Sequence, residues 1–111
     1  MKGTHLGEFE ELILLTTAVV DGNAYTVSIV NEVEKNTGRK LTLSAVHTAL
    51  VRLEKKGFVN SYMGGTTTER GGRRRRLYKI TAPGFRTLND AREIRSKMWE
   101  LIPKLSFDMI G

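Results

Sequence analysis

Four consecutive arginines, Arg73, Arg74, Arg75 and Arg76, form the densest positive charge of the chain. Residues 64–80 hold six Lys or Arg residues against one Glu, although the whole chain has a net charge of only +6. Cations gathered in one segment indicate a polyanion or an anionic surface as partner more directly than a high overall charge does. Taken alone, the run would also suit a solvated loop or a patch that lies on a membrane surface.

A second candidate surface is the polar side of a helix predicted over residues 42–57. A hydroxyl of Thr42 or Ser44 can cap its start, and Gly57 ends it. Its apolar residues recur at helical spacing around Leu50, which predicts one buried face. The opposite face carries short polar groups followed by a long cation, so another molecule can approach it closely; plain exposure to solvent is the alternative. These polar residues are Ser44, His47, Thr48 and Arg52.

Neither set of residues matches a catalytic or metal-binding pattern. Cysteine is absent, and the two histidines, His5 and His47, are far apart in the sequence. The glycines near the arginine run do not form GxxxxGK[ST], and the run belongs to a hairpin instead of joining a strand to a helix. The serines and histidines have no recognisable nucleophile setting. We therefore expect no catalytic function, no bound metal and no cofactor.

The elements that must position these side chains follow from the apolar period and from the turn residues. A buried helix is predicted over residues 6–20, and an amphipathic one over 25–37 that starts near Asn23 and stops at Gly38. After the third helix the period becomes strand-like, which predicts a β-hairpin with a long glycine-rich loop. Thr81 can cap a fourth helix that runs to about Ile102.

No apolar stretch approaches the roughly 18 residues that a membrane span needs. The chain also begins without a secretory signal pattern. We therefore expect no membrane partner and a cytoplasmic location.

Three helices followed by a hairpin, with a polar face on the third helix, is the element order of a winged helix-turn-helix domain. The predicted fold is mainly α (α+β), with a winged-helix DNA-binding domain over 1–82 and a C-terminal dimerisation helix and tail over 83–111. The third helix would enter the major groove of duplex DNA, and Arg39 and Lys40 would contact phosphates. Side chains alternate along a strand, so only about two of the consecutive arginines can face one duplex together. The expected wing contacts are Arg70, Arg73, Arg74, Arg75 and Arg76.

The fourth helix has a wider apolar arc than one docking face requires. The arc covers about 200°, whereas a helix that docks on one body needs about 100°. We expect this helix to touch its own domain and a second copy of the chain; one deep groove in its own domain is the alternative. The residues expected at the dimer contact are Leu88, Ile94, Met98, Leu101 and Ile102.

From about Leu6 to Leu101, the sequence resembles the PadR-like transcriptional regulators. The segment SAVHTALVRLEKKGFV resembles their recognition helix. GRRRRLYKITAPG resembles the second strand of their wing and the Tyr-x-x-Thr-x-x-Gly pattern at its end, which here is Tyr78, Thr81 and Gly84. LGEFEELILLTTAV and AYTVSIVNEV resemble their first two helices. One departure is His47, where many members carry tyrosine, so the detailed contacts of that turn are not carried over.

This resemblance implies a homodimeric repressor that binds an inverted-repeat operator through duplex DNA contacts. It also implies that the C-terminal helix of each copy packs on the N-terminal region of its partner. Short members of the family bind planar or hydrophobic small molecules between subunits, some against a tryptophan on that helix. Trp99, the only tryptophan, is therefore a candidate effector contact, with ordinary dimer packing as the alternative.

Two further classes of function fit parts of the pattern. An RNA-binding winged helix would account for the arginine-rich loop, and it predicts a preference for structured RNA over duplex DNA at equal salt. A protein-interaction module with an acidic partner predicts no DNA affinity above the electrostatic level of about 10⁻⁴ to 10⁻⁶ M.

Overall fold

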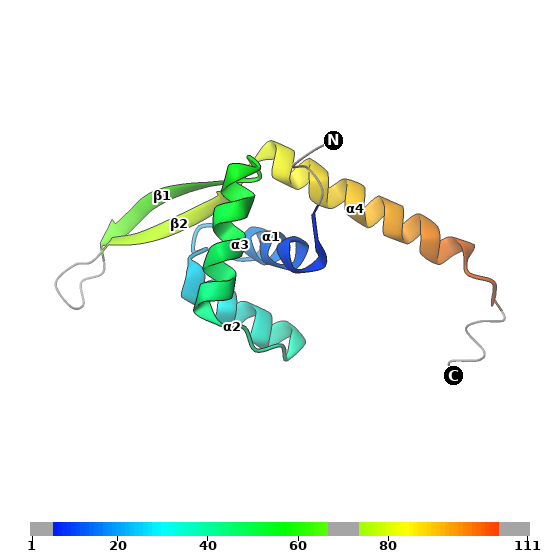
Figure 1. The fold of residues 1–111 in the computed structure, drawn as a ribbon, viewed down its shortest axis with the longest axis horizontal. Coiled ribbons are helices and arrows are strands. Elements are labelled where there is room, and N and C mark those ends of the chain that lie inside the picture. The colour runs from blue at the N-terminus through cyan, green and yellow to red at the C-terminus, as the bar shows by residue number, and fades with distance from the viewer. Residues whose placement is uncertain (1–5, 67–73, 105–111) are drawn as a thin grey trace.

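The computed structural model describes residues 6–66 and 74–104, in four helices and one antiparallel hairpin (Figure 1). Three helices form the body, the hairpin projects from one side of it, and the last helix projects on the other side. This is the mainly helical winged fold expected from the sequence. In chain order the elements are α1 (Glu8–Val19), α2 (Thr26–Thr37), α3 (Leu43–Lys55), β1 (Val59–Thr66), β2 (Arg74–Ile80) and α4 (Ala82–Leu101).

Helix α1 is the centre of the molecule, because it contacts α2, α3, β2 and α4. The apolar period of each helix predicts which side it buries, and the buried residues follow that period. One continuous core results, which fixes α3 against α1 and α2 while its polar side stays exposed. The largest fully buried side chains are Tyr78, Ile13, Leu14, Ile29, Leu50, Leu53, Val33, Val46 and Val59.

The helix ends follow the expected capping chemistry with one exception. The hydroxyls of Thr42 and Thr81 each accept a hydrogen bond from the backbone three residues later, both at 3.1 Å. Gly38 has the left-handed conformation that ends α2, at φ 75°. The prediction of Asn23 as the α2 cap was wrong, because α2 starts at Thr26 and the amide of Tyr25 donates to the Ser28 hydroxyl at 3.0 Å.

The hairpin is anchored to the body at its inner end. Val59 pairs with Ile80 and Ser61 with Tyr78, and the register shifts between Gly64 and Thr66. The amide of Tyr78 donates to the Ala24 carbonyl at 2.8 Å, which ties β2 to the turn before α2. The outer part therefore extends from the body as a wing.

Helix α4 begins in tight contact with the body and then leaves it. A methyl group added at Gly84 would lie 2.3 Å from the carbonyl oxygen of Phe58, so glycine permits this close approach. Leu88, one turn later, is still in the core with 6% of its surface exposed. Beyond it the apolar side chains of α4 are mostly exposed.

Candidate nucleic-acid interface

Helix α3 presents the polar face that its sequence predicts. Ser44, His47, Thr48 and Arg52 are all exposed, while the opposite side of the helix is buried in the core. Three of these four residues also line a shallow hollow of about 560 Å³ between α3 and the start of α1. The sequence indicated the exposed face but not the neighbouring start of α1.

Three acids in the first turn of α1 pair with cations from three other parts of the fold. Glu8 pairs with Arg39 before α3 at 2.8 Å, and Glu10 pairs with Lys56 after α3 at 2.6 Å. Glu11 pairs with Arg95 of α4. Acids in the first turn of a helix interact favourably with its dipole. The structure shows that they also connect α1 to both ends of α3 and to α4.

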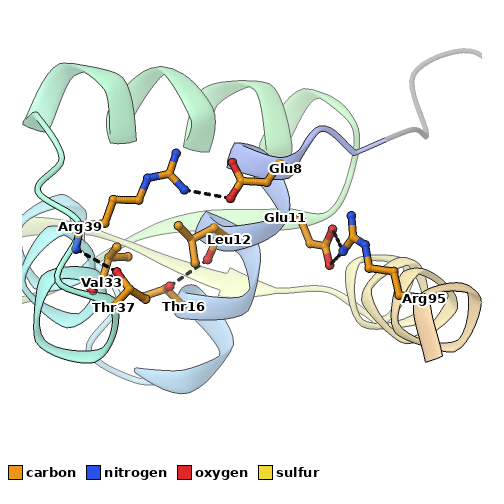
Figure 2. A network of polar contacts seen from close by, with 8 residues as sticks. All are labelled: Glu8, Glu11, Leu12, Thr16, Val33, Thr37, Arg39 and Arg95. Carbon is orange, nitrogen blue, oxygen red and sulfur yellow. Dashed lines mark hydrogen bonds and ion pairs between the residues drawn. The ribbon is translucent and has the colours of Figure 1, made fainter. Parts of the chain in front are cut away.

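Arg39 and Lys40, the expected phosphate contacts, lie exposed in the turn before α3. Figure 2 shows the Arg39 guanidinium directed at Glu8 from this turn. The guanidinium carbon of Arg39 also lies 5.6 Å from the ring centre of Phe9. Both partners of the Glu8 pair are substantially exposed, and such surface pairs contribute about 0–1 kcal/mol. The pair is therefore weak enough for a phosphate to replace the carboxylate.

The three described wing arginines differ in their surroundings, although all are exposed. The guanidinium carbon of Arg75 lies 4.3 Å from the ring centre of Tyr25. Arg76 donates to the hydroxyl of Ser61 at 3.0 Å. The side chain of Arg74 makes no hydrogen bond or ion pair with the side chains that the structure describes. Arg70 and Arg73, the other two expected wing contacts, lie outside the described residues.

Two other groups on β2 are perturbed by their surroundings. Burial raises the pKa of the Tyr78 phenol; nearby Arg76 opposes this shift and Glu54 adds to it. A hydrogen bond to Asp21, 3.0 Å long, raises the pKa of Lys79. Lys79 therefore stays protonated, and the carboxylate of Asp21 offsets its charge.

The apolar side of α4 is the second notable surface. Ile94, Met98 and Leu101 are between 60% and 68% exposed, as is Trp99, and Ile102 is half-buried. Leu88 differs from the other residues expected at the dimer contact, because it packs into the core of its own chain. The apolar arc of α4 is thus divided: Leu88 is buried against the body, whereas Phe85 in the first turn and the apolar residues of the later turns are exposed.

A hollow of about 520 Å³ lies where α4 leaves α1. Its apolar walls come from both helices, and Trp99 lies at its outer end. Figure 2 shows Arg95 of α4 directed at Glu11 of α1 across this junction. The Glu11 side chain is only 11% exposed, and its hydrogen bond raises the pKa of Arg95. The apolar lining residues are Leu15, Ala18, Val19, Phe85, Leu88 and Trp99.

Within residues 6–66 and 74–104, no group of three His, Asp or Glu side chains could hold a metal ion. His47 has no such neighbours there. No helix in the same part of the chain is long and apolar enough to cross a membrane.

A three-helix body with an exposed helix α3 and a basic hairpin beside it defines a winged-helix protein. The family model described as "Transcriptional regulator PadR-like family" matches residues 14–90. The chain therefore belongs to the PadR-like family of transcriptional regulators. A comparison with curated proteins gave no match.

Solved structures share this fold over nearly the whole chain. A PadR family transcription regulator from hypervirulent Clostridium difficile R20291 is 26% identical, with a TM-score of 0.58 over 91% of this chain and 98% of that one. A PadR-like transcriptional regulator from Bacillus cereus is 16% identical, with a TM-score of 0.66 over 93% and 91%. Bacillus subtilis PadR, solved in complex with operator DNA, is 19% identical, with a TM-score of 0.61 over 87% of this chain and 51% of that one.

Proposed function

We propose that this chain is a sequence-specific DNA-binding transcriptional repressor that acts as a homodimer. The observation that carries the proposal is the exposed polar face of α3 beside a basic hairpin, in the fold of a family with a member solved on operator DNA. Residues 1–82 would form the DNA-binding domain and residues 83–111 the dimerisation segment. Such a protein would work in the cytoplasm.

In this proposal α3 enters the major groove, which is about 12 Å wide and admits one helix. Ser44, His47, Thr48 and Arg52 contact base edges, with Arg52 suited to a bidentate contact with guanine. Arg39 and Lys40 contact phosphates at the start of the helix, and the basic wing contacts the backbone beside it. Arg39 exchanges Glu8 for phosphate when DNA binds.

The uncovered side of α4 supports the dimer. Five large apolar side chains exposed on one helix, four of them in its later turns, are unusual for a surface that stays in water, and an apolar patch of this kind indicates a protein contact. In a twofold dimer the same patch of each copy meets its equivalent. Two α3 helices related in this way would read an inverted repeat, with half-sites about 34–36 Å apart.

The hollow between α1 and α4 supports a small-molecule effector. Its walls are mainly apolar and Trp99 borders it, which suits a planar or hydrophobic compound. Such a compound would change DNA affinity only if it prefers one dimer geometry over another. Titration of flat aromatic compounds against Trp99 fluorescence tests this part: saturable quenching supports it, and no response across a broad panel contradicts it.

Selection of bound sequences from random duplex DNA, followed by a salt titration on the winner, tests the central proposal. We expect an inverted repeat that binds at least about 10³-fold more tightly than random DNA. Enrichment of no sequence, together with a steep salt dependence, would contradict sequence-specific binding. A parallel titration with structured RNA tests the RNA-binding alternative, which predicts tighter binding to RNA than to duplex DNA at equal salt. The protein-interaction alternative would be favoured if this chain bound an acidic protein and showed only generic affinity for DNA.

A further inference from the structure

A short chain of hydrogen bonds connects the candidate recognition helix to the wing. Nη1 of Arg76 on β2 donates to Oγ of Ser61 on β1 at 3.0 Å, and that hydroxyl donates to Oε2 of Glu54 on α3 at 2.8 Å. The two ends of this chain are charged, so both bonds are charge-assisted and stronger than bonds between neutral groups. The cation of Arg76 is therefore directed toward the body by its contact with Ser61.

The strand register shows that this link crosses the hairpin on one face. Ser61 is opposite Tyr78 and Met63 is opposite Arg76, so Ser61 and Arg76 are diagonal neighbours on the two strands. Adjacent side chains of a strand face opposite ways, which puts Arg75 on the other face. There its guanidinium lies over the ring of Tyr25, the residue before α2. The wing is thus held to the body from both faces.

We propose that Arg76 is a positioning residue that sets the wing relative to α3 through Ser61 and Glu54, and that Arg74 makes the phosphate contact. This inference rests on the proposed function of the chain and refines the roles of neighbouring arginines in it. Arg74 lies on the same face as Arg76, but its side chain makes no hydrogen bond or ion pair with the described side chains. Its guanidinium is accordingly available to an external anion.

The link through Ser61 helps to fix the orientation of the hairpin relative to α3. A two-stranded hairpin has little stability of its own, so its angle to α3 depends on contacts with the body. The bond from Tyr78 to Ala24 attaches β2 to the body, and Ser61, the cross-strand partner of Tyr78, attaches β1 to α3 through Glu54. Arg76 lies two positions farther along β2 and holds the Ser61 hydroxyl in this link. Arg76 also offsets the carboxylate of Glu54, which lies in the last turn of α3 and would otherwise repel phosphates beside the helix.

Arg76→Gln and Arg74→Gln form a matched pair for the test, because each removes one cation from the same strand face. The measurements are the affinity for the selected operator and the salt dependence of binding to random duplex DNA. For Arg74→Gln we expect the salt slope on random DNA to fall by about 1, as for any lost phosphate contact. For Arg76→Gln we expect that slope to stay unchanged, while operator affinity falls by about 5- to 30-fold.

Variants of Ser61 test the positioning role without changing the charge of the wing, because serine is uncharged. Ser61→Ala removes the link and should lower operator affinity as much as Arg76→Gln does. Ser61→Thr keeps the hydroxyl and should bind the operator with wild-type affinity. The double variant Ser61→Ala with Arg76→Gln should be no weaker than either single variant, because both remove the same link. Circular dichroism and thermal unfolding check that each variant is folded. If Arg76→Gln does not fold, the comparison of Ser61→Ala with Ser61→Thr still tests whether the link positions the wing.

Two results would overturn the inference: operator affinity unchanged in Ser61→Ala, or a salt slope lowered equally by the two arginine variants. A wild-type chain without any preferred sequence would instead contradict the proposed function. In that case the slopes of the two arginine variants on random DNA still decide whether Arg74 or Arg76 binds phosphate.

Discussion

At the scale of single residues, Gly84 and Tyr78 show how tightly the last helix and the wing join the body. Gly84 lets the backbone of α4 pass the carbonyl of Phe58, and Tyr78 fills the core beneath the hairpin. Both residues belong to the pattern at the end of the wing that resembles the PadR-like family. Their roles are physical ones, close approach for the glycine and burial for the phenol.

Gly84→Ala is expected to lower the free energy of unfolding by about 1–3 kcal/mol, as overpacking typically does. The new methyl group would meet a backbone carbonyl at 2.3 Å, and backbone cannot move aside as a flexible side chain can. Urea unfolding measures the change, and exposed Arg86→Ala in the same turn is the control. Equal stability of the wild-type and Gly84→Ala chains would show that α4 shifts without cost.

Tyr78 should make the protein less stable at alkaline pH. Burial raises its pKa above the ordinary 10.0, so its stabilising contribution is complete below about pH 10 and is lost as pH rises through the higher folded pKa. The unfolded chain releases the phenolic proton first and is favoured. Denaturation series between about pH 9 and pH 11 should show a smaller loss of stability in Tyr78→Phe than in wild type. Parallel losses in the two chains would exclude Tyr78 as the cause.

At the scale of elements, much of the fold could be predicted because its signals are local. The hydroxyls of Thr42 and Thr81, the left-handed Gly38 and the apolar period of α3 all act within a few residues. For the same reason the sequence indicated the exposed polar face of α3 and the hairpin. Among the helix caps it misassigned that of α2, which starts at Thr26 with the Ser28 hydroxyl accepting from the Tyr25 amide.

The contacts between elements could not be predicted, because no local pattern specifies them. Glu8 and Arg39 are 31 positions apart, and Glu11 and Arg95 are 84 apart. The alternation of side chains along a strand predicted that only about two wing arginines face one duplex, but it did not indicate their partners, which come from β1 and from the residue before α2. The sequence-based prediction grouped Leu88 with the dimer contacts, because the apolar arc of a helix does not show where that helix leaves the body.

The Glu11 and Arg95 pair gives a prediction about two elements, α1 and α4. Arg95→Gln should destabilise the fold, because the carboxylate of Glu11 is largely buried and would lose its charged partner. The double variant Glu11→Gln with Arg95→Gln should recover part of the loss, since no unpaired buried charge remains. Thermal unfolding of the three chains measures this order. A double variant less stable than Arg95→Gln would contradict it.

At the scale of the whole molecule, the body has two projections of opposite character. The hairpin is polar and cationic, while α4 exposes apolar side chains along its later turns. The longest extent of the molecule is 60 Å, because these projections leave the body on different sides. In the proposed dimer, one projection serves DNA and the other serves the second copy.

Met98→Glu should weaken the proposed dimer and, with it, operator binding. A carboxylate buried at a subunit contact is costly unless it finds a partner. Sedimentation equilibrium should show a shift from dimer to monomer, and affinity for the inverted repeat should fall while a single half-site is bound as before. Lys97→Glu, which changes charge on the neighbouring exposed position, is the control. A monomeric wild-type chain, or a dimer that Met98→Glu leaves intact, would contradict this role of α4.

The acids of α1 have a consequence for communication across the molecule. Glu8 pairs with the turn before α3, and Glu11 pairs with α4, so the two attachments are three residues apart on one helix. Residues at this spacing are neighbours, with about 5–6 Å between their Cβ atoms. An effector that tilts α4 would therefore act almost directly on the segment that leads into α3. In the proposed regulator the coupling distance would be about one helical turn, so no long relay through the core would be needed.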